Sequence, residues 1–205
     1  AGSQGALNAL ASEIADLAFA ATPVIRNELI NRDHLSGNLV SARRALMTAM
    51  FQKESEERLG FEGFPPACAL YLSLLKPLHV KGADGGLRFQ TPEDDPFWQS
   101  TARWLASQGI VTAQALYDYW SRPPFGLKQG PMPILALAFY LANRSRIALY
   151  ENGAFTPEFS DEILDEWLAS PERIGLRMIE ASGRNQELVA ALSGKLARFR
   201  GEQPE

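Results

Sequence analysis

The chain has 205 residues, of which 46% are hydrophobic and 21% charged, and its formal net charge at pH 7 is −4. This composition is that of a globular protein long enough to bury a core, and it excludes a disordered chain and a collagen-like fibre. The one cysteine, Cys68, cannot form a disulfide within the chain, so we expect a reducing compartment, the cytoplasm.

We expect neither a membrane-spanning segment nor a signal peptide. The most apolar run, residues 132–142, is much shorter than the roughly 20 residues that span a bilayer. The apolar stretch 5–21 contains Glu13 and Asp16, and no lysine or arginine precedes it, which is a poor match to a signal peptide. The sequence leaves open whether the chain is a piece of a larger protein.

The first half of the chain predicts helices followed by a hairpin. Apolar residues at spacings of three and four predict an amphipathic helix near the start: Leu7, Leu10, Ile14, Leu17 and Ala18. Capping and proline signals predict further helices over 23–31, from Ser36 to about Ser55, and over 66–75. Residues 60–66 are rich in glycine and proline and predict a turn. Alternation around a glycine-rich loop predicts a hairpin over 78–89.

The second half repeats this plan. Helices are predicted from Asp95 to about Gly109, from a cap at Thr112, and over the apolar run that ends near Ala142. Asn152-Gly153 lies between alternating apolar residues and predicts a hairpin over 147–156, because both turn positions require a positive φ. A capped helix from Ser160, a strand over 174–179 and an amphipathic helix over 186–199 complete the prediction.

Three helices followed by a β-hairpin is the layout of a winged-helix domain, and this order occurs near residues 23–90 and again near 95–156. The sequence therefore predicts a mainly α fold with short β-hairpins, arranged as tandem winged-helix-like units. We expect N-terminal helices plus the first unit over 1–91, the second unit over 92–180, and a C-terminal helix and tail over 181–205. The alternative is one continuous helical domain that carries two hairpins.

The sequence contains no constellation that amounts to an active site. It has no P-loop, no His-Glu-x-x-His and no Gly-x-Ser-x-Gly motif. The two histidines, His34 and His79, lack nearby cysteine or histidine partners for a metal. Cys68 is interpreted as a buried structural thiol, and the carboxylates of 161–166 as a solvated helix face. We therefore expect no catalytic residue, no metal, no cofactor and no enzyme activity.

Basic residues of the first half suggest a phosphate-binding surface for duplex DNA. The candidate contacts are Arg32, Arg43, Arg44, Lys76, Lys81 and Arg88. The predicted third helices, 66–75 and 132–142, carry no charged or amide side chain up to Leu141, so base readout is not expected. Any DNA contact would be to the backbone and independent of sequence. Charge is also uneven, because residues 150–172 include seven acidic residues and no basic one, whereas 173–200 include six basic and two acidic residues.

Two groups of segments carry a family resemblance. They are residues 27–36, 42–46 and 60–66, and residues 123–133, 147–155 and 171–173. Together they resemble the region downstream of the ATPase domain in large bacterial P-loop ATPases of anti-phage defence systems, including BREX-type ATPases. The resemblance implies a non-catalytic interaction module that docks onto other domains or subunits of a larger ATPase assembly. The ATP-binding motifs of that family are missing here, so no nucleotide-binding residue is carried over. The alternative function is a winged-helix module that contacts duplex DNA through its phosphates.

Overall fold

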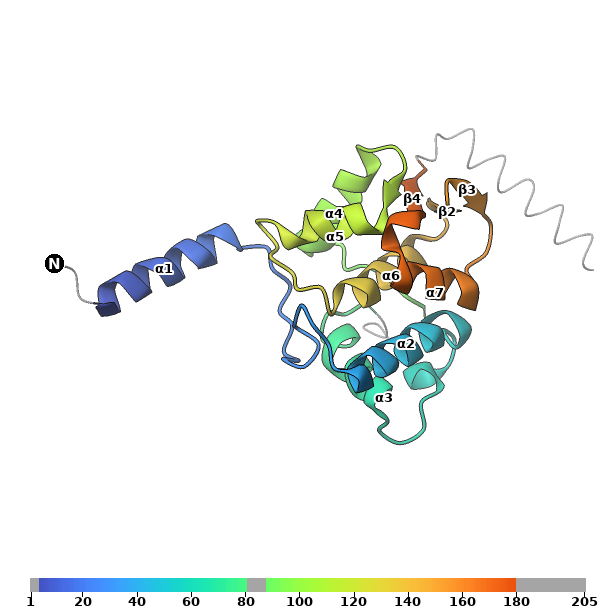
Figure 1. Cartoon of the computed structure of the whole chain (residues 1–205), viewed down its shortest axis with the longest axis horizontal. Coiled ribbons are helices and arrows are strands. Elements are labelled where there is room, and N and C mark those ends of the chain that lie inside the picture. The colour runs from blue at the N-terminus through green and yellow to red at the C-terminus, as the bar shows by residue number, and fades with distance from the viewer. Residues whose placement is uncertain (1–3, 81–87, 180–205) are drawn as a thin grey trace, which may run out of the picture.

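The computed structural model describes residues 4–80 and 88–179 (Figure 1), and helices make up most of the regular structure in both segments. The first segment contains α1 (Gln4–Ala18), α2 (Gly37–Gln52) and α3 (Pro66–Leu70). A π-helical turn (Tyr71–Leu75) continues α3 without a break, so the helix predicted over 66–75 is confirmed. Cys68 is fully buried on α3, as predicted.

The helix predicted over 23–31 is wrong, because this stretch forms only a turn near Leu29. The side-chain oxygen of Asn27 accepts hydrogen bonds from the backbone N–H groups of Leu29 (3.0 Å) and Ile30 (3.3 Å). An asparagine that satisfies local N–H groups in this way offers the backbone an alternative to a helix. The chain therefore turns once here and delivers Ile30 into the core, where it is fully buried.

The hairpin predicted over 78–89 lies partly outside the described residues, which omit 81–87. The two flanks do meet, because the N–H of Gln90 donates to the carbonyl oxygen of Val80 at 3.0 Å. Neither flank forms a regular strand within the residues that the structure describes.

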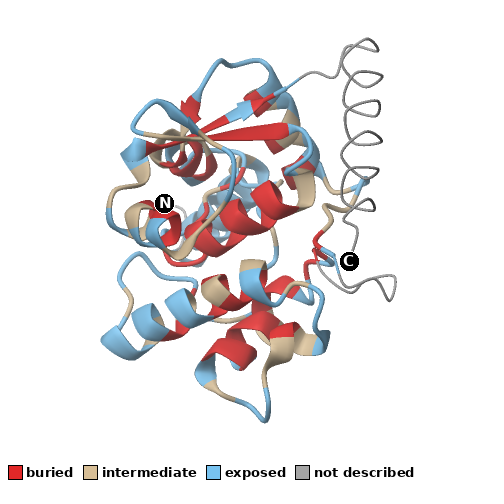
Figure 2. Cartoon of the chain, turned by 90° about the vertical axis from the view of Figure 1, so that its right-hand side faces the viewer, coloured by how far each residue is buried: buried red, intermediate tan, exposed pale blue. Residues whose placement is uncertain are grey.

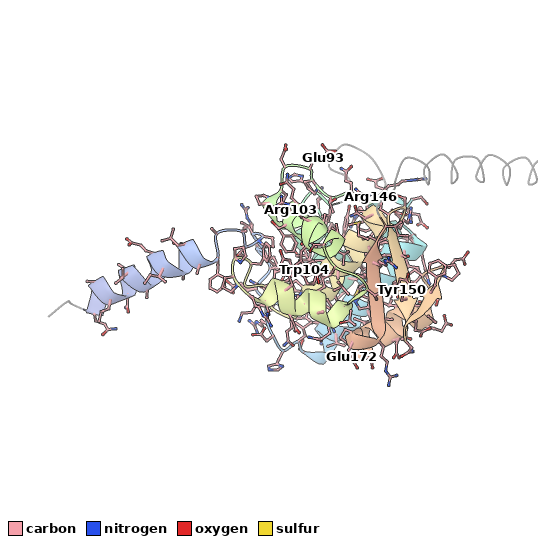
Figure 3. All side chains as sticks on the ribbon, turned by 90° about the horizontal axis from the view of Figure 1, so that it is seen from above. Glu93, Arg103, Trp104, Arg146, Tyr150 and Glu172 are labelled. Carbon is pink, nitrogen blue, oxygen red and sulfur yellow. The ribbon has the colours of Figure 1, made fainter. Side chains whose placement is uncertain are left out.

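Capped helices dominate the second segment. α4 (Pro96–Ala106) follows Asp95, whose carboxylate accepts from the N–H of Phe97 at 2.8 Å. α5 (Ala113–Ser121) and α7 (Asp161–Ala169) are capped in the same way by the hydroxyls of Thr112 and Ser160. Side-chain oxygens at these positions satisfy N–H groups that the first turn of a helix leaves free. All three caps agree with the prediction, and they fix where each helix begins. Trp104 of α4, labelled in Figure 3, stacks on Tyr119 of α5 with ring centroids 4.3 Å apart.

A small antiparallel sheet has four strands in the order β1-β4-β2-β3. They are β1 (Val111–Thr112), β2 (Ile147–Glu151), β3 (Ala154–Thr156) and β4 (Ile174–Met178). β2 and β3 form the predicted hairpin, and its turn residues Asn152 and Gly153 have φ values of 49° and 81°. β4 pairs with both β1 and β2, and Leu176 lies opposite Val111 on one side and Leu149 on the other.

The apolar helix α6 (Met132–Asn143) lies at the centre of the molecule, between α2 and α7 on one side and α5 on the other (Figure 1). Every residue from Met132 to Leu141 is buried, as predicted for a helix that is apolar all round. Buried residues from Ile30 to Met178 belong to one core cluster, and Figure 2 shows them both around α2 and α3 and around the sheet. The domain boundary near 91–94 stays a prediction.

None of the described helices is long and apolar enough to cross a membrane.

Candidate functional site

The structure gives the two adjacent arginines of α2 different surroundings. Arg44 is exposed and binds Asp165 of α7 with both ends of its guanidinium fork, Nε to Oδ1 at 2.8 Å and Nη2 to Oδ2 at 2.9 Å. This pair raises the pKa of Arg44 and lowers the pKa of Asp165, because each charge stabilises the other. The charge and the planar face that a phosphate would need are therefore already occupied.

Arg32 and Arg43 both meet Gly130 in the loop before α6. The N–H of Gly130 donates to the carbonyl oxygen of Arg32 at 2.8 Å, and the carbonyl oxygen of Gly130 lies 3.5 Å from Nη1 of Arg43. The side chain of Arg32 folds back, so that Nε donates to the carbonyl oxygen of Glu28 at 2.9 Å. Arg32 thus links the segment before α2 to the loop before α6.

The other predicted phosphate contacts are Lys76, Lys81 and Arg88. Lys76 and Arg88 are exposed, and Lys81 lies outside the described residues. Arg88 lines a shallow hollow together with Arg144, whose Nη2 forms an ion pair with Glu54 at 2.7 Å. Arg32, through its backbone, and Arg43, through its side chain, thus both contact Gly130, whereas Arg44 forms an ion pair on another side of α2.

Three acidic residues of α7 have side-chain partners on neighbouring segments. Asp161 accepts from Nε2 of Gln52 at 2.7 Å, and Glu166 pairs with Arg173 at 3.0 Å. With the Arg44–Asp165 pair, the Asp161 contact joins α7 to α2, whereas Glu166 joins α7 to the turn that follows it.

A cleft of about 390 Å³ lies where four segments meet: the stretch from Asp33 to Arg43, α5, the loop into α6, and the end of α7. Arg43 is half-buried in it, and its Nε is fully buried with no hydrogen-bond partner among the described residues. The contact of its Nη1 with Gly130 is at the long limit of a hydrogen bond. Burial lowers the pKa of Arg43, and no described carboxylate forms an ion pair with it.

Tyr117 of α5 and Trp167 of α7 form the buried wall of this cleft. Nε1 of Trp167 donates to the Tyr117 hydroxyl oxygen at 2.6 Å. Burial raises the pKa of Tyr117, so the phenol keeps its proton at neutral pH and can donate it. Arg43 lines the same cleft, and its charge opposes the effect of burial on the pKa of Tyr117. The cleft thus offers an arginine and a phenol as donors.

The carboxylates that line the cleft already have partners. Asp33 pairs with Nζ of Lys128 at 3.0 Å and accepts from the N–H of Gln129 at 3.3 Å, which lowers the pKa of Asp33. Asp118 accepts from Nε2 of Gln114 at 2.8 Å. Each of these two carboxylates therefore has a local partner other than Arg43.

Sequence reasoning included Arg43 among the candidates, but for a phosphate surface, and it missed Tyr117 and Trp167. No local motif marks them, because the three residues come from elements that are far apart in the chain and meet only in the fold. In the two described segments, no three His, Cys, Asp or Glu side chains gather as a metal site would require.

Compared with models of protein families, with curated proteins and with solved structures, the chain has no match. Its resemblance to the region downstream of the ATPase domain in BREX-type ATPases therefore stays a prediction. Any function assigned to the chain has to be inferred from the chemistry of its own residues.

Proposed function

We propose that this chain is a non-catalytic interaction module that docks onto other domains or subunits of a larger bacterial defence-associated ATPase. The observation that carries the proposal is α1. No residue of α1 is buried, and its apolar residues Leu7, Leu10, Ile14 and Leu17 are 54% to 80% exposed. Figures 1 and 3 show from two directions that α1 stands clear of the rest of the chain.

The spacing of these four residues places them in a row on one side of the helix. An isolated helix of about 15 residues is only marginally stable in water, and an exposed leucine row adds an unfavourable apolar surface. Both costs are removed when the row lies in an apolar groove of a partner. The only charged residues of α1 are Glu13 and Asp16, so the complementary groove is apolar with a rim of lysine or arginine.

The residues directly after the C-terminal end of α1 attach this helix to the rest of the described chain. The Thr22 hydroxyl donates to the carbonyl oxygen of Phe125, and the N–H of Ala21 donates to that of Pro124 at 3.1 Å. The Phe19 ring lies against Gly126, where it leaves no room for a Cβ. A helix that is attached at one end and exposed along its whole length can bind the surface of another protein.

The element order also supports the winged-helix-like assignment of the second unit. α4, β1, α5, α6, β2 and β3 follow the order helix, strand, two helices and a hairpin, and β4 then joins the sheet. For the first unit the support consists of α2, α3 and the hydrogen bond between Val80 and Gln90.

The observations favour protein docking over the duplex-DNA alternative. A recognition helix must expose polar side chains to a groove, whereas α6 is buried from Met132 to Leu141. Arg44 is held by Asp165, and Arg43 turns toward the cleft. The net charge of the chain is −4, so the basic residues that remain on the surface do not give it the positive surplus typical of a DNA-binding protein.

Site-specific photo-crosslinking in the native host tests the proposal. A photoreactive phenylalanine analogue at Leu10 should crosslink to a polypeptide that contains a P-loop, identified by mass spectrometry. The matched control is the same analogue at Ser12, which lies about 180° around the helix from the leucine row and should give little product. Leu7→Asp combined with Leu17→Asp should abolish the Leu10 crosslink. Equal crosslinking from Leu10 and Ser12, or a partner without a P-loop, would contradict the proposal.

A further inference from the structure

Among the charged side chains that the structure describes, only Arg43 has a buried polar atom without a hydrogen-bond partner. Its buried Nε has no partner, and its Nη1 has one contact of 3.5 Å, to the carbonyl oxygen of Gly130. Burying a charge without a counter-charge or good hydrogen bonds is costly, and folded proteins rarely leave such a group unfilled. The hydroxyl of Tyr117, which lines the same cleft, accepts from Trp167 and has its own proton for another acceptor. Two residues with donor groups thus line one cleft, and neither has a good acceptor for its free N–H or O–H among the described residues.

We propose that this cleft binds a small organic monocarboxylate. The carboxylate accepts hydrogen bonds from the Arg43 guanidinium and the Tyr117 hydroxyl, and the apolar body of the ligand lies against Leu35, Val40 and Met132. Arginine suits this role because its planar fork matches the two oxygens of a carboxylate. The cleft volume of about 390 Å³ is in the range of small-molecule sites and sets the size of the ligand.

The charges of the lining favour a carboxylate over a phosphate. Two acidic residues, Asp33 and Asp118, line the same cleft. Their repulsion acts about twice as strongly on a phosphate dianion as on a monocarboxylate, whose single charge Arg43 alone can balance. The cleft is also separate from α1, so this site goes beyond the docking function and does not depend on it.

Isothermal titration calorimetry with three probes tests the proposal on the whole chain. The probes are benzoate, benzamide, which has a similar shape without the charge, and inorganic phosphate. We expect benzoate to bind with a Kd of about 1 mM or tighter. Benzamide and phosphate should bind at least about tenfold more weakly, because a charge-assisted hydrogen bond contributes roughly tenfold or more to affinity. Equal binding of benzoate and benzamide, tighter binding of phosphate, or no saturable binding of benzoate would overturn the proposal.

Two variants of the cleft and one matched control complete the test. Arg43→Gln should weaken benzoate binding at least about tenfold, and Arg43→Lys, which keeps the charge but loses the fork, should weaken it by a smaller factor. Arg44→Gln is the control, because Arg44 is the next residue of α2 and faces Asp165 instead of the cleft. It should bind benzoate like the wild type. Near-UV circular dichroism checks that each variant is folded. If Arg43→Gln is not folded, the benzoate affinity of Arg43→Lys is the test of the proposal. Unchanged binding by a folded Arg43 variant would overturn the proposal.

Discussion

Gly130 joins the segment before α2 to the loop before α6, and the replacement Gly130→Ala should separate them. A Cβ at this position would overlap the carbonyl oxygen of Ile30 and would lie 2.8 Å from that of Arg32 and 3.0 Å from Cδ2 of Leu35. Two of these atoms belong to the backbone, and Ile30 is fully buried, so the segment cannot move aside as a side chain would. The whole junction has to shift.

The cost has two parts. Forcing extra volume into a packed site costs about 1–3 kcal/mol. The shift also breaks the hydrogen bond from the Gly130 N–H to Arg32, which contributes about 0.5–1.5 kcal/mol. Together, we expect the free energy of unfolding to fall by about 2–4 kcal/mol. The shift should also weaken benzoate binding, because the carbonyl oxygen of Gly130 contacts Arg43.

Urea unfolding followed by tryptophan fluorescence measures this change. With a slope of about 2–3 kcal/mol per molar urea, the midpoint should fall by roughly 1 M. The matched control is Gly109→Ala, because no atom lies within 4 Å of a Cβ built there. Its stability should stay within about 0.5 kcal/mol of the wild type. If Gly130→Ala unfolds at the same urea concentration as Gly109→Ala, the reasoning from the close backbone contacts is refuted.

Two further predictions concern polar groups. Thr101→Val should cost about 1–3 kcal/mol in urea unfolding, because the buried Thr101 hydroxyl accepts from Nε1 of Trp120 at 2.9 Å and valine would leave that N–H unpaired. Its control is Thr48→Val, which should be neutral or stabilising because the buried Thr48 hydroxyl has no described partner. A larger loss of unfolding free energy for Thr48→Val than for Thr101→Val would contradict this account. Arg44→Gln should raise the pKa of Asp165 toward its ordinary value, as measured by NMR titration. The ion pair lowers the pKa of Asp165 in the folded protein. The stabilisation of the fold by this pair is therefore fully present when the pH is above the ordinary pKa of an aspartate, and it is lost as the pH falls through the lowered pKa. An unchanged Asp165 pKa would show that the ion pair does not form in solution.

Local signals predicted much of the fold. The apolar run of α6 and the caps at Asp95, Thr112 and Ser160 each depend on a few neighbouring residues, and each was confirmed. The Asn152-Gly153 hairpin is likewise local, because a positive φ at both positions is a property of the turn itself.

The remaining elements depend on contacts between distant residues. β1 has two residues, too few for any alternation, and it exists as a strand because β4 pairs with it. The misassigned stretch 23–31 carries helix-start signals that the Asn27 side chain overrides. The cleft is the clearest case, because successive helical residues point about 100° apart and only the tertiary fold decides which way Arg43 and Arg44 face.

The same cleft links function to stability, and Arg43→Met tests this link. Methionine keeps an apolar stem of similar length and removes a charge that has no ion pair in the described part of the chain. Because the wild type bears the cost of desolvating this guanidinium, we expect Arg43→Met to raise the free energy of unfolding by about 1 kcal/mol in the absence of ligand. Benzoate should stabilise the wild type by mass action and leave the variant unchanged, so that the order of their Tm values reverses at saturating ligand. A variant less stable than the ligand-free wild type would show that protein groups already satisfy Arg43, and the case for a missing acceptor would fail.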